Sequence, residues 1–350
     1  MMLDDLQVLQ RKDSQDMLGF AARQYEQAAR FYEVFNPDHD ERAVSNIVLV
    51  GMGGSGLANA LLKTWLGAHL TLPCEVIREY DVPGYVSDST LVIVSSCSGN
   101  TEEAYTALNA ARQRGAQVAI VTGGGRLLTR AVADDIAHIQ LTDVSGVQSK
   151  TLTVAQVRAV AILLGHFGAV NREASTEIAD LAEWLKSEMA MWTADVSTAR
   201  NYAKQLALHA VGKTPVFYGG ELTRTVAYKW KVGWNENAKN IAFCGEYPEG
   251  AHNELAGWTS HPIEKPFAVF DIISSFERER VLKCFALSNR LLSGKRPNAV
   301  TIELQGDTLL KQLLWGSVLA DFASIYVGIM NNVDPGPVPF VTKFKRALDE

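Results

Sequence analysis

The stretch "TLVIVSSCSGNTEEA" (90–104) joins two patterns that together decide the fold. Its first five residues form a short apolar run, which is typical of a strand buried on both faces of a parallel sheet. From Thr101 onward the residues follow a helical pattern that ends at Gly115, a residue suited to the position just beyond a helix. A buried strand that passes directly into a helix is the building unit of doubly wound α/β domains.

The same alternation of strand and helix extends to both sides of this stretch. We predict further strands in the first half at 46–50, 74–80, 117–124 and 136–141. A helical region follows at about 151–210, and the alternation then starts again, with strands at 215–220, 240–246, 266–273 and 298–304. The sequence therefore predicts a duplicated α/β fold. Two doubly wound parallel-sheet domains, flavodoxin-like or Rossmann-like sandwiches, are expected in residues 1–195 and 196–350.

The composition is that of a globular protein and argues against several classes of function. Of the 350 residues, 47% are hydrophobic and 21% are charged, with a net charge of −6. The sequence contains no block of like charges of the kind that binds nucleic acid. The four cysteines lack the spacing of a disulfide framework or a zinc site, and no His, Asp and Glu cluster has metal-ligand spacing. We therefore predict no nucleic-acid partner and no metal.

The sequence gives no sign of export or of a membrane anchor. Residues 1–17 lack the apolar core of a signal peptide. The apolar stretch 151–170 has helical periodicity but carries Gln156, Arg158 and His166, so we interpret it as a buried helix. We expect a cytoplasmic protein without a membrane partner.

A glycine-rich loop, "GMGGSG" (51–56), follows the first predicted strand and opens a helix. Its spacing matches the dinucleotide fingerprint, and Glu79 and Asp81 near the end of the second strand leave that interpretation open. The signal is weak alone, because such glycines let any phosphate approach a helix N-terminus. A tight turn without a ligand is a further alternative.

A second loop, "SSCSGNT" (95–101), is rich in hydroxyl groups and leaves the third predicted strand. The hydroxyls of Ser96, Ser98 and Thr101, with the backbone amides of Gly99 and Asn100, form a cup suited to one small tetrahedral anion. The sequence lacks the Gly-Lys end of a nucleoside-triphosphate P-loop. The alternative is a helix cap, but one cap needs only one hydroxyl.

The two loops, about forty residues apart, resemble those of the sugar isomerase (SIS) domain family, whose members bind phosphosugars, and "VSGVQSKTLTVAQ" (144–156) adds to the likeness. "WNENAKNIAFCGEYPEGAHNELAGW" (234–258) and "VDPGPVPFVTKFKRAL" (333–348) resemble the bifunctional phosphoglucose/phosphomannose isomerases. The resemblance extends from about residue 40 to 348. It implies a cofactor-independent isomerase that converts glucose 6-phosphate or mannose 6-phosphate into fructose 6-phosphate through an enediol.

The resemblance also implies roles for single residues. Glu236 would be the base, His252 would assist ring opening from the neighbouring subunit of a homodimer, and Lys345 matches the family's near-terminal lysine. The residues expected to line the sugar are Gly53, Gly54 and Ser55, and those expected to hold the phosphate are Ser96, Ser98 and Thr101. We further expect Trp230 and Trp234 to desolvate Glu236 and raise its pKa, and Asn253 and Glu254 to orient the His252 ring.

One departure from the family leaves the substrate open. The bifunctional isomerases have an arginine after the fifth strand that stabilises the enediolate, whereas "GVQSKTL" (146–152) offers Lys150. The sequence therefore leaves open the C2 configuration of the sugar. It also leaves open whether the sugar carries an amino group, and whether a sulfonate replaces the phosphate. An isomerase or deaminase of an amino- or sulfo-sugar and a non-catalytic phosphosugar-binding regulator are further alternatives. The joint presence of Glu236, His252 and Lys345 favours an enzyme.

Overall fold

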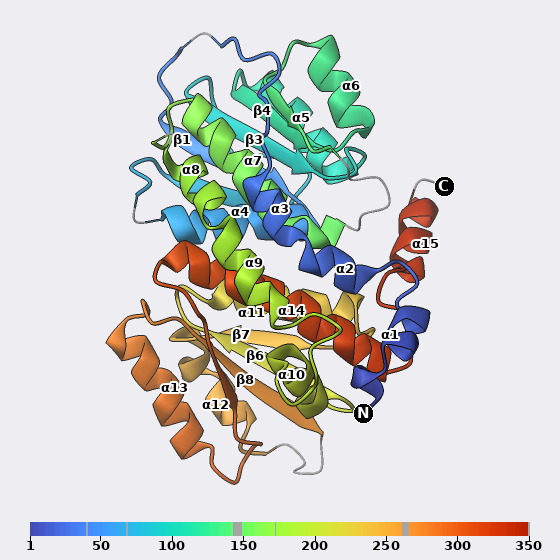
Figure 1. Cartoon of the computed structure of the whole chain (residues 1–350). Helices are drawn as coiled ribbons and strands as arrows, with labels where there is room; N and C mark the ends of the chain where they lie inside the picture. Colours follow the sequence, from blue (N-terminus) through green and yellow to red (C-terminus); the bar gives the residue numbers. More distant parts are fainter. Residues whose placement is uncertain (40, 68, 143–148, 172, 261–265, 349–350) are drawn as a thin grey trace. The chain divides into compact units, whose positions relative to one another are not determined.

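The computed structural model describes residues 1–39, 41–67, 69–142, 149–171, 173–260 and 266–348. The chain forms two compact units, each built around one parallel sheet (Figure 1). Unit 1 combines Met1–Ala22 with Ser187–Glu350, and unit 2 is Arg23–Lys186. This division differs from the domains expected at 1–195 and 196–350, because the first helices of the chain pack with its second half.

Unit 2 contains a five-stranded sheet in the order β2-β1-β3-β4-β5. The strands are β1 (Asn46–Gly51), β2 (Cys74–Ile77), β3 (Thr90–Ser96), β4 (Gln117–Thr122) and β5 (His138–Gln140). Helices cover both faces, with α4 (Gly53–Leu66) and α7 (Thr153–His166) packed together and α5 (Glu102–Gln113) and α6 (Gly125–Ala133) on the other face. The outer helices are α3 (Gln24–Ala29) and α8 (Glu173–Asp180), and the short helix η2 spans Ser149–Thr151.

Unit 1 repeats this architecture with a four-stranded sheet in the order β7-β6-β8-β9. Its strands are β6 (Thr214–Gly219), β7 (Phe243–Glu246), β8 (Phe267–Ile273) and β9 (Val300–Glu303). Its helices are η1 (Met2–Asp4), α1 (Leu6–Lys12), α2 (Met17–Ala22), α10 (Tyr202–Ala210), α11 (Arg224–Glu236), η3 (Glu249–His252), α12 (Glu254–Gly257), α13 (Glu279–Leu291), α14 (Leu309–Met330) and α15 (Pro339–Leu348). Helix α9 (Ala182–Ala190) spans the boundary between the units.

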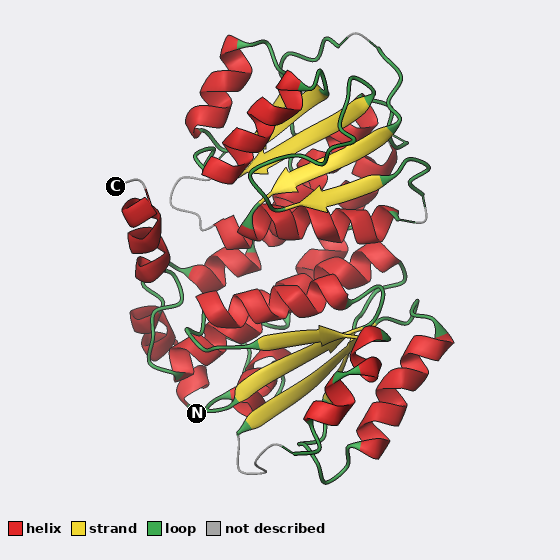
Figure 2. Cartoon of the chain, turned by 180° about the vertical axis from the view of Figure 1, so that it is seen from behind, coloured by secondary structure: helices red, strands yellow, loops and turns green. Residues whose placement is uncertain are grey.

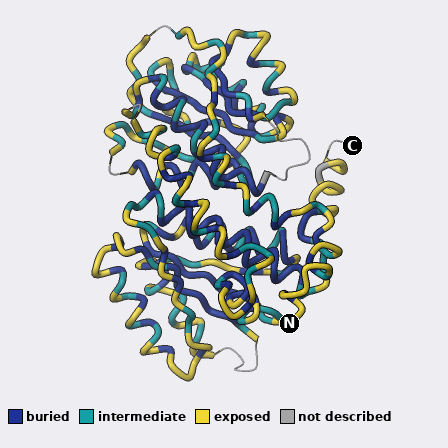
Figure 3. The backbone as a smooth tube through the Cα atoms, viewed as in Figure 1, coloured by how far each residue is buried: buried dark blue, intermediate teal, exposed yellow. Residues whose placement is uncertain are grey.

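The prediction of two doubly wound parallel sheets is confirmed. In both units helices flank the sheet, and the central strands are buried along most of their length (Figures 2 and 3). Because buried parallel strands face helices on both sides, they read in the sequence as continuous apolar runs.

Helix α14 is the core helix of unit 1. Its mean hydropathy of 1.6 and length would suit a membrane span, but 94% of its most apolar window is buried. It packs against α11 through the buried ion pair between Lys229 and Asp321, at 2.6 Å. Just beyond the end of α11, the side-chain Nδ2 of Asn237 donates to Ser324 Oγ at 2.8 Å. These polar contacts inside an apolar interface fix how α11 lies on α14.

The N-terminal helix is shorter than its amphipathic pattern suggests. The stretch 17–35 is amphipathic throughout, but the structure breaks the helix near Arg23 and ends α3 at Ala29. The chain then becomes extended, and Phe35 pairs with His138 at the edge of the sheet, with backbone hydrogen bonds of 2.8 and 3.0 Å. Pairing with a distant strand has overridden the local helical preference.

Candidate active site

The two predicted loops lie next to each other at one edge of the sheet in unit 2. Strand β1 lies between β2 and β3, and the last residue of β1, Gly51, is paired with Ser95 of β3. The chain therefore leaves both strands at the point where the strand order reverses. Open α/β sheets bind their ligands at this point, outside the carboxyl ends of the strands.

The glycine loop needs its glycines for a close turn. A Cβ atom on Gly51 would lie 3.0 Å from the Gly56 nitrogen, and Gly53 has a positive φ of 51°. Helix α4 begins at Gly53 without a side-chain cap. Of the residues predicted to face the sugar, Gly53 is exposed, Gly54 is partly exposed and Ser55 is buried. The Ser55 and Gly56 amides donate to Met52 O at 3.0 and 3.3 Å. Among the described residues the Gly53 and Gly54 amides have no acceptor, so they can serve an anion.

The hydroxyl groups of the second loop bind within the loop and do not cap the helix. Ser96 Oγ donates to Thr101 Oγ1 at 2.9 Å and accepts from the Gly99 amide at 3.2 Å. Thr101 is the N-cap residue of α5, yet its side chain makes no capping hydrogen bond. Ser98 is exposed and accepts weakly from the Asn100 amide, at 3.3 Å. The simple helix-cap alternative therefore does not account for these side chains.

A third loop supports this cup, and the sequence analysis did not single it out. Residues 123–126 follow β4, and the Gly123 amide donates to Cys97 O at 3.0 Å. The Arg126 amide donates to Asn100 Oδ1, also at 3.0 Å. The signal was present in the sequence as three consecutive glycines after an apolar run.

Two cations lie near the glycine loop. Lys150 is 5% exposed and belongs to η2, which packs against α4. The residues before it in the predicted motif, 143–148, lie outside the described part of the chain. Arg78 follows β2, was not predicted, and donates to Gly56 O at 3.3 Å. Together they bring positive charge to the helix that opens from the glycine loop.

The other predicted residues belong to unit 1. Glu236 is the last residue of α11 and lines a cavity of about 330 Å³ between the end of α11 and the start of α15. Lys239 links the end of α11 to the segment before α15, because its ammonium donates to Glu236 O at 2.7 Å and to Pro335 O at 3.1 Å. Burial lowers the pKa of Lys239, while Asp334 and Glu236 oppose this shift. The cavity thus combines a carboxylate, a cation and apolar walls that include Phe340 and Val341.

The expected role of the tryptophans is not what the structure shows. Trp230 and Trp234 are fully buried in the core, with stacked rings 5.4 Å apart, and both contact Phe217. They lie two and six positions before Glu236, which places them on other sides of the helix. Their burial anchors α11 and does not cover the carboxylate.

His252 is the last residue of η3, and its side chain is exposed. Among the described residues its ring makes no hydrogen bond, so the expected orientation by Asn253 and Glu254 is not seen. Glu254 lies next to Tyr218, and Asn253 Nδ2 donates to Glu249 Oε1 at 3.4 Å.

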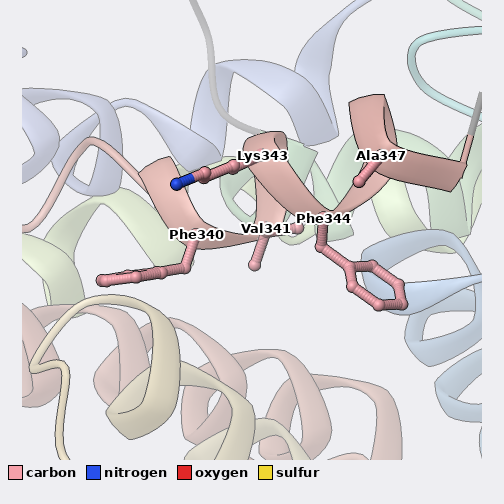
Figure 4. Close-up of a pocket in the computed structure, with 5 residues that line it drawn as sticks. All are labelled: Phe340, Val341, Lys343, Phe344 and Ala347. Atoms are coloured by element: carbon pink, nitrogen blue, oxygen red, sulfur yellow. The ribbon is translucent and has the colours of Figure 1, made fainter. Parts of the chain in front are cut away.

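Lys345 lies within α15, whose backbone is described at this position. Figure 4 shows the side chains of Phe340, Val341, Phe344 and Ala347 along this helix, with the two phenylalanine rings pointing away from it. Phe340 is 85% exposed, so the helix presents an apolar face to solvent beside the Glu236 cavity.

In unit 1 the corresponding turn is filled by the protein itself. Strand β6 lies between β7 and β8, and the loop after it leads into α11. Both carboxylate oxygens of Glu277 lie 3.2 Å from the Leu222 amide, and a Cβ on Gly220 would overlap this carboxylate. Glu277 is 6% exposed, and burial raises its pKa although the Leu222 amide opposes the shift. In unit 1 the Glu277 carboxylate thus accepts from the amide of the turn after β6. In unit 2 no side-chain carboxylate is seen at the corresponding turn after β1 among the described residues.

The hydroxyls around this turn are also satisfied internally. Thr223 Oγ1 donates to Ile272 O at 2.7 Å, and Ser274 Oγ donates to Gln312 Oε1 at 2.7 Å. Gln312 also donates to Ser275 Oγ at 2.7 Å. Side chains that could have formed a second anion cup are therefore used for packing.

Replacing Glu277 by alanine should destabilise unit 1 and make it responsive to phosphate. The Leu222 amide loses its acceptor, so the free energy of unfolding should fall by about 1–3 kcal/mol. Inorganic phosphate should then raise the Tm of Glu277→Ala more than that of the wild type, because a bound anion replaces the carboxylate. Glu221→Ala is the control, because Glu221 pairs with Arg278 at the surface, at 3.1 Å. Equal responses of both variants to phosphate, at matched ionic strength, would contradict the interpretation.

Comparison with known proteins agrees with this two-part organisation. The SIS domain model matches residues 42–162, and the model of the bacterial phospho-glucose isomerase C-terminal SIS domain matches residues 199–348. The bifunctional phosphoglucose/phosphomannose isomerase of Caldicellulosiruptor bescii is 29% identical over 311 residues, which are 88% of this chain and 90% of that protein. The D-glucosamine-6-phosphate 4-epimerase of Sulfolobus acidocaldarius is 29% identical over 241 residues, 67% of this chain and 72% of that protein.

Solved structures share the fold at lower sequence identity. A glucose-6-phosphate isomerase-like protein of Thermus thermophilus superposes with a TM-score of 0.65 and 18% identity, and 98% of each chain is covered. The two domain matches together include both loops of unit 2 and the Glu236 and His252 segments of unit 1. The chain belongs to the SIS domain family, and its second half is a C-terminal SIS domain of the bacterial phosphoglucose isomerase type.

Proposed function

We propose that the protein is an aldose–ketose isomerase of a hexose 6-phosphate, converting glucose 6-phosphate or mannose 6-phosphate into fructose 6-phosphate. The observation that carries this proposal is the hydroxyl-rich loop 95–101, whose side chains do not cap helix α5. It lies beside the glycine loop at the edge of the sheet where domains of this fold bind ligands. The names of curated relatives that align over most of the chain support the same reaction. The domain match also favours a phosphosugar over the dinucleotide alternative.

The phosphate would bind to the hydroxyl loop. Ser96, Ser98 and Thr101 supply hydroxyl donors, and the amides at the start of α5 add a partial positive charge. A doubly charged phosphate would replace the weak hydrogen bonds that these groups now make within the loop. Gly53, Gly54 and Ser55 would then face the sugar, because the paired ends of β1 and β3 hold the two loops together.

Proton transfer would be performed by groups of unit 1. Isomerisation removes a proton from C2 of the aldose and returns one to C1, and the charge that develops on the oxygens must be stabilised. Glu236 would act as the base, because it is a carboxylate at the wall of a cavity with apolar residues. His252 would assist ring opening, and Lys345 would be the third catalytic residue. Lys150 would take the place of the family's arginine as a compact cation near the reacting oxygens.

An amino- or sulfo-sugar remains the second candidate substrate. The specific observation for an amino group is the similarity to a relative named D-glucosamine-6-phosphate 4-epimerase. Lys150 in place of the family's arginine also leaves the substrate open, because a compact ammonium group and a planar guanidinium group make different hydrogen bonds to a sugar. A sulfonate is also a tetrahedral anion, so the hydroxyl loop does not distinguish it from phosphate. A non-catalytic sensor would not need Glu236, His252 and Lys345 together.

We further propose a cytoplasmic homodimer that requires no metal or nucleotide. An exposed His252 whose ring makes no hydrogen bond among the described residues is suited to meet groups of a neighbouring subunit. The exposed apolar face of α15 also suits an assembly larger than one chain.

Removing donors from the hydroxyl loop should weaken sugar-phosphate binding. Ser98→Ala with Thr101→Ala deletes two donors to a charged group, each worth about 1.5–3 kcal/mol, so affinity should fall at least about tenfold. Calorimetry with glucose 6-phosphate and fructose 6-phosphate measures this. Ser89→Ala, before the amino end of the same strand, is the control and should bind normally. Unchanged affinity in the double variant would mean that the loop holds no phosphate.

Replacing Glu236 by glutamine should abolish turnover while binding persists. The amide keeps the size of the side chain but cannot take up the C2 proton. NMR in D2O, on a panel of aldose and ketose phosphates, should show loss of both isomerisation and solvent exchange at C1 and C2. Glu183→Gln, which changes an exposed glutamate, should leave both unchanged. Exchange at a near-native rate in Glu236→Gln would exclude it as the base.

A mixing experiment tests the proposed dimer. His252→Ala and Glu236→Gln homodimers should each be nearly inactive. If His252 acts across the interface, a mixed dimer has one site with both lesions and one intact site. Random exchange should then restore about a quarter of wild-type activity, because half of the dimers are mixed. Full subunit exchange without recovered activity would place His252 in its own chain's site or outside the reaction.

A further inference from the structure

The Tyr218 side chain lies near the end of β6, beside two residues that follow His252 in the chain. Trp258 Nε1 donates a hydrogen bond to the Tyr218 hydroxyl oxygen at 3.0 Å. The carboxylate of Glu254 lies next to Tyr218 and helps to raise the pKa of its hydroxyl, after the larger effect of burial. Tyr218 therefore packs beside both Trp258 and Glu254 and restrains both side chains.

The backbone of β7 packs closely against this group. A Cβ atom on Gly245 would lie 2.7 Å from Glu254 Oε1 and 2.7 Å from Tyr218 Cε1. Glycine at the third position of β7 thus lets the carboxylate pack directly over the strand. The guanidinium of Arg296 lies over the rings of Tyr218 and Trp258, 5.3 and 5.6 Å from their centroids.

The other end of the same segment is attached to the next residue of β6. The Tyr247 amide donates to Gly219 O at 2.8 Å, and the Tyr247 ring stacks on that of Tyr218 with centroids 5.4 Å apart. Two consecutive residues at the end of β6 therefore hold both ends of the segment 247–258. His252 lies between these attachments, and its exposed ring has no hydrogen bond of its own among the described residues.

We propose that Tyr218 is a positioning residue for catalysis, and that its hydroxyl fixes, through Glu254 and Trp258, the segment that presents His252. This inference rests on the proposed isomerase function and on the role of His252 in it. Tyr218 is 2% exposed, so its side chain is fixed by the packing around it. Burial raises the pKa of Tyr218 far above its usual range, and the neighbouring carboxylate of Glu254 adds to this shift.

The test is a double-mutant cycle between Tyr218 and His252. Tyr218→Phe removes only the hydroxyl and should lower kcat about tenfold for the isomerisation of glucose 6-phosphate, with KM changed less than about twofold. In the His252→Ala background the same change should have almost no further effect, because the residue that it positions is gone. Tyr247→Phe is the matched control, since its ring stacks on Tyr218 but its hydroxyl faces Ser288.

Hydrogen exchange gives a readout that does not depend on activity. The amides of 249–258 should exchange faster in Tyr218→Phe than in the wild type, and unchanged exchange would overturn the proposal. Effects of Tyr218→Phe and His252→Ala that multiply would also overturn it. If Tyr218→Phe does not fold, Gly245→Ala tests the same contact by displacing Glu254, and it should show the same non-additivity with His252→Ala. Wild-type activity in His252→Ala alone would instead contradict the proposed function.

Discussion

The parallel pairing of the first strand of each unit with the third is the constraint on which the other features depend. In unit 2 it sets Gly51 beside Ser95, and in unit 1 it sets Gly219 beside Ile272. Because the second strand lies on the opposite side, two loops must leave the sheet at the same place in each unit. The two predicted loops of unit 2 and the Glu277 carboxylate of unit 1 lie at this place, and helices α4, α5 and α11 begin there.

The two units use this shared geometry for different purposes. In unit 2 the hydroxyls of Ser96 and Thr101 bond to each other at 2.9 Å, and the hydroxyl of Ser98 is exposed. In unit 1 the same turn is closed by Glu277, and the end of β6 serves as an attachment point for the segment with His252. This difference fits the proposal that unit 2 binds the phosphate and that unit 1 supplies catalytic side chains.

Much of this organisation could be predicted from the sequence, because strands buried on both faces must be continuously apolar. The loops at 51–56 and 95–101 could be found since their glycines and hydroxyls interrupt that pattern at the strand ends. The Tyr218 contacts could not, because Glu254 and Trp258 lie 36 and 40 residues further along the chain. The early end of α3 depends on a pairing between Phe35 and His138, and the placement of Trp230 depends on α14. Such details follow from tertiary contacts that no local pattern contains.

The carboxylate of Glu277 has a consequence for competition between ligands. A group carried on the chain and already aimed at the Leu222 amide has an effective concentration of millimolar or more. A free phosphate ester would have to displace the buried Glu277 carboxylate and also bind the Leu222 amide more strongly than that carboxylate does. Even abundant phosphorylated metabolites should therefore not bind at this turn of unit 1. Duplication of a phosphate-binding fold need not duplicate its binding capacity, and substrate is not withdrawn into a site where no reaction can occur.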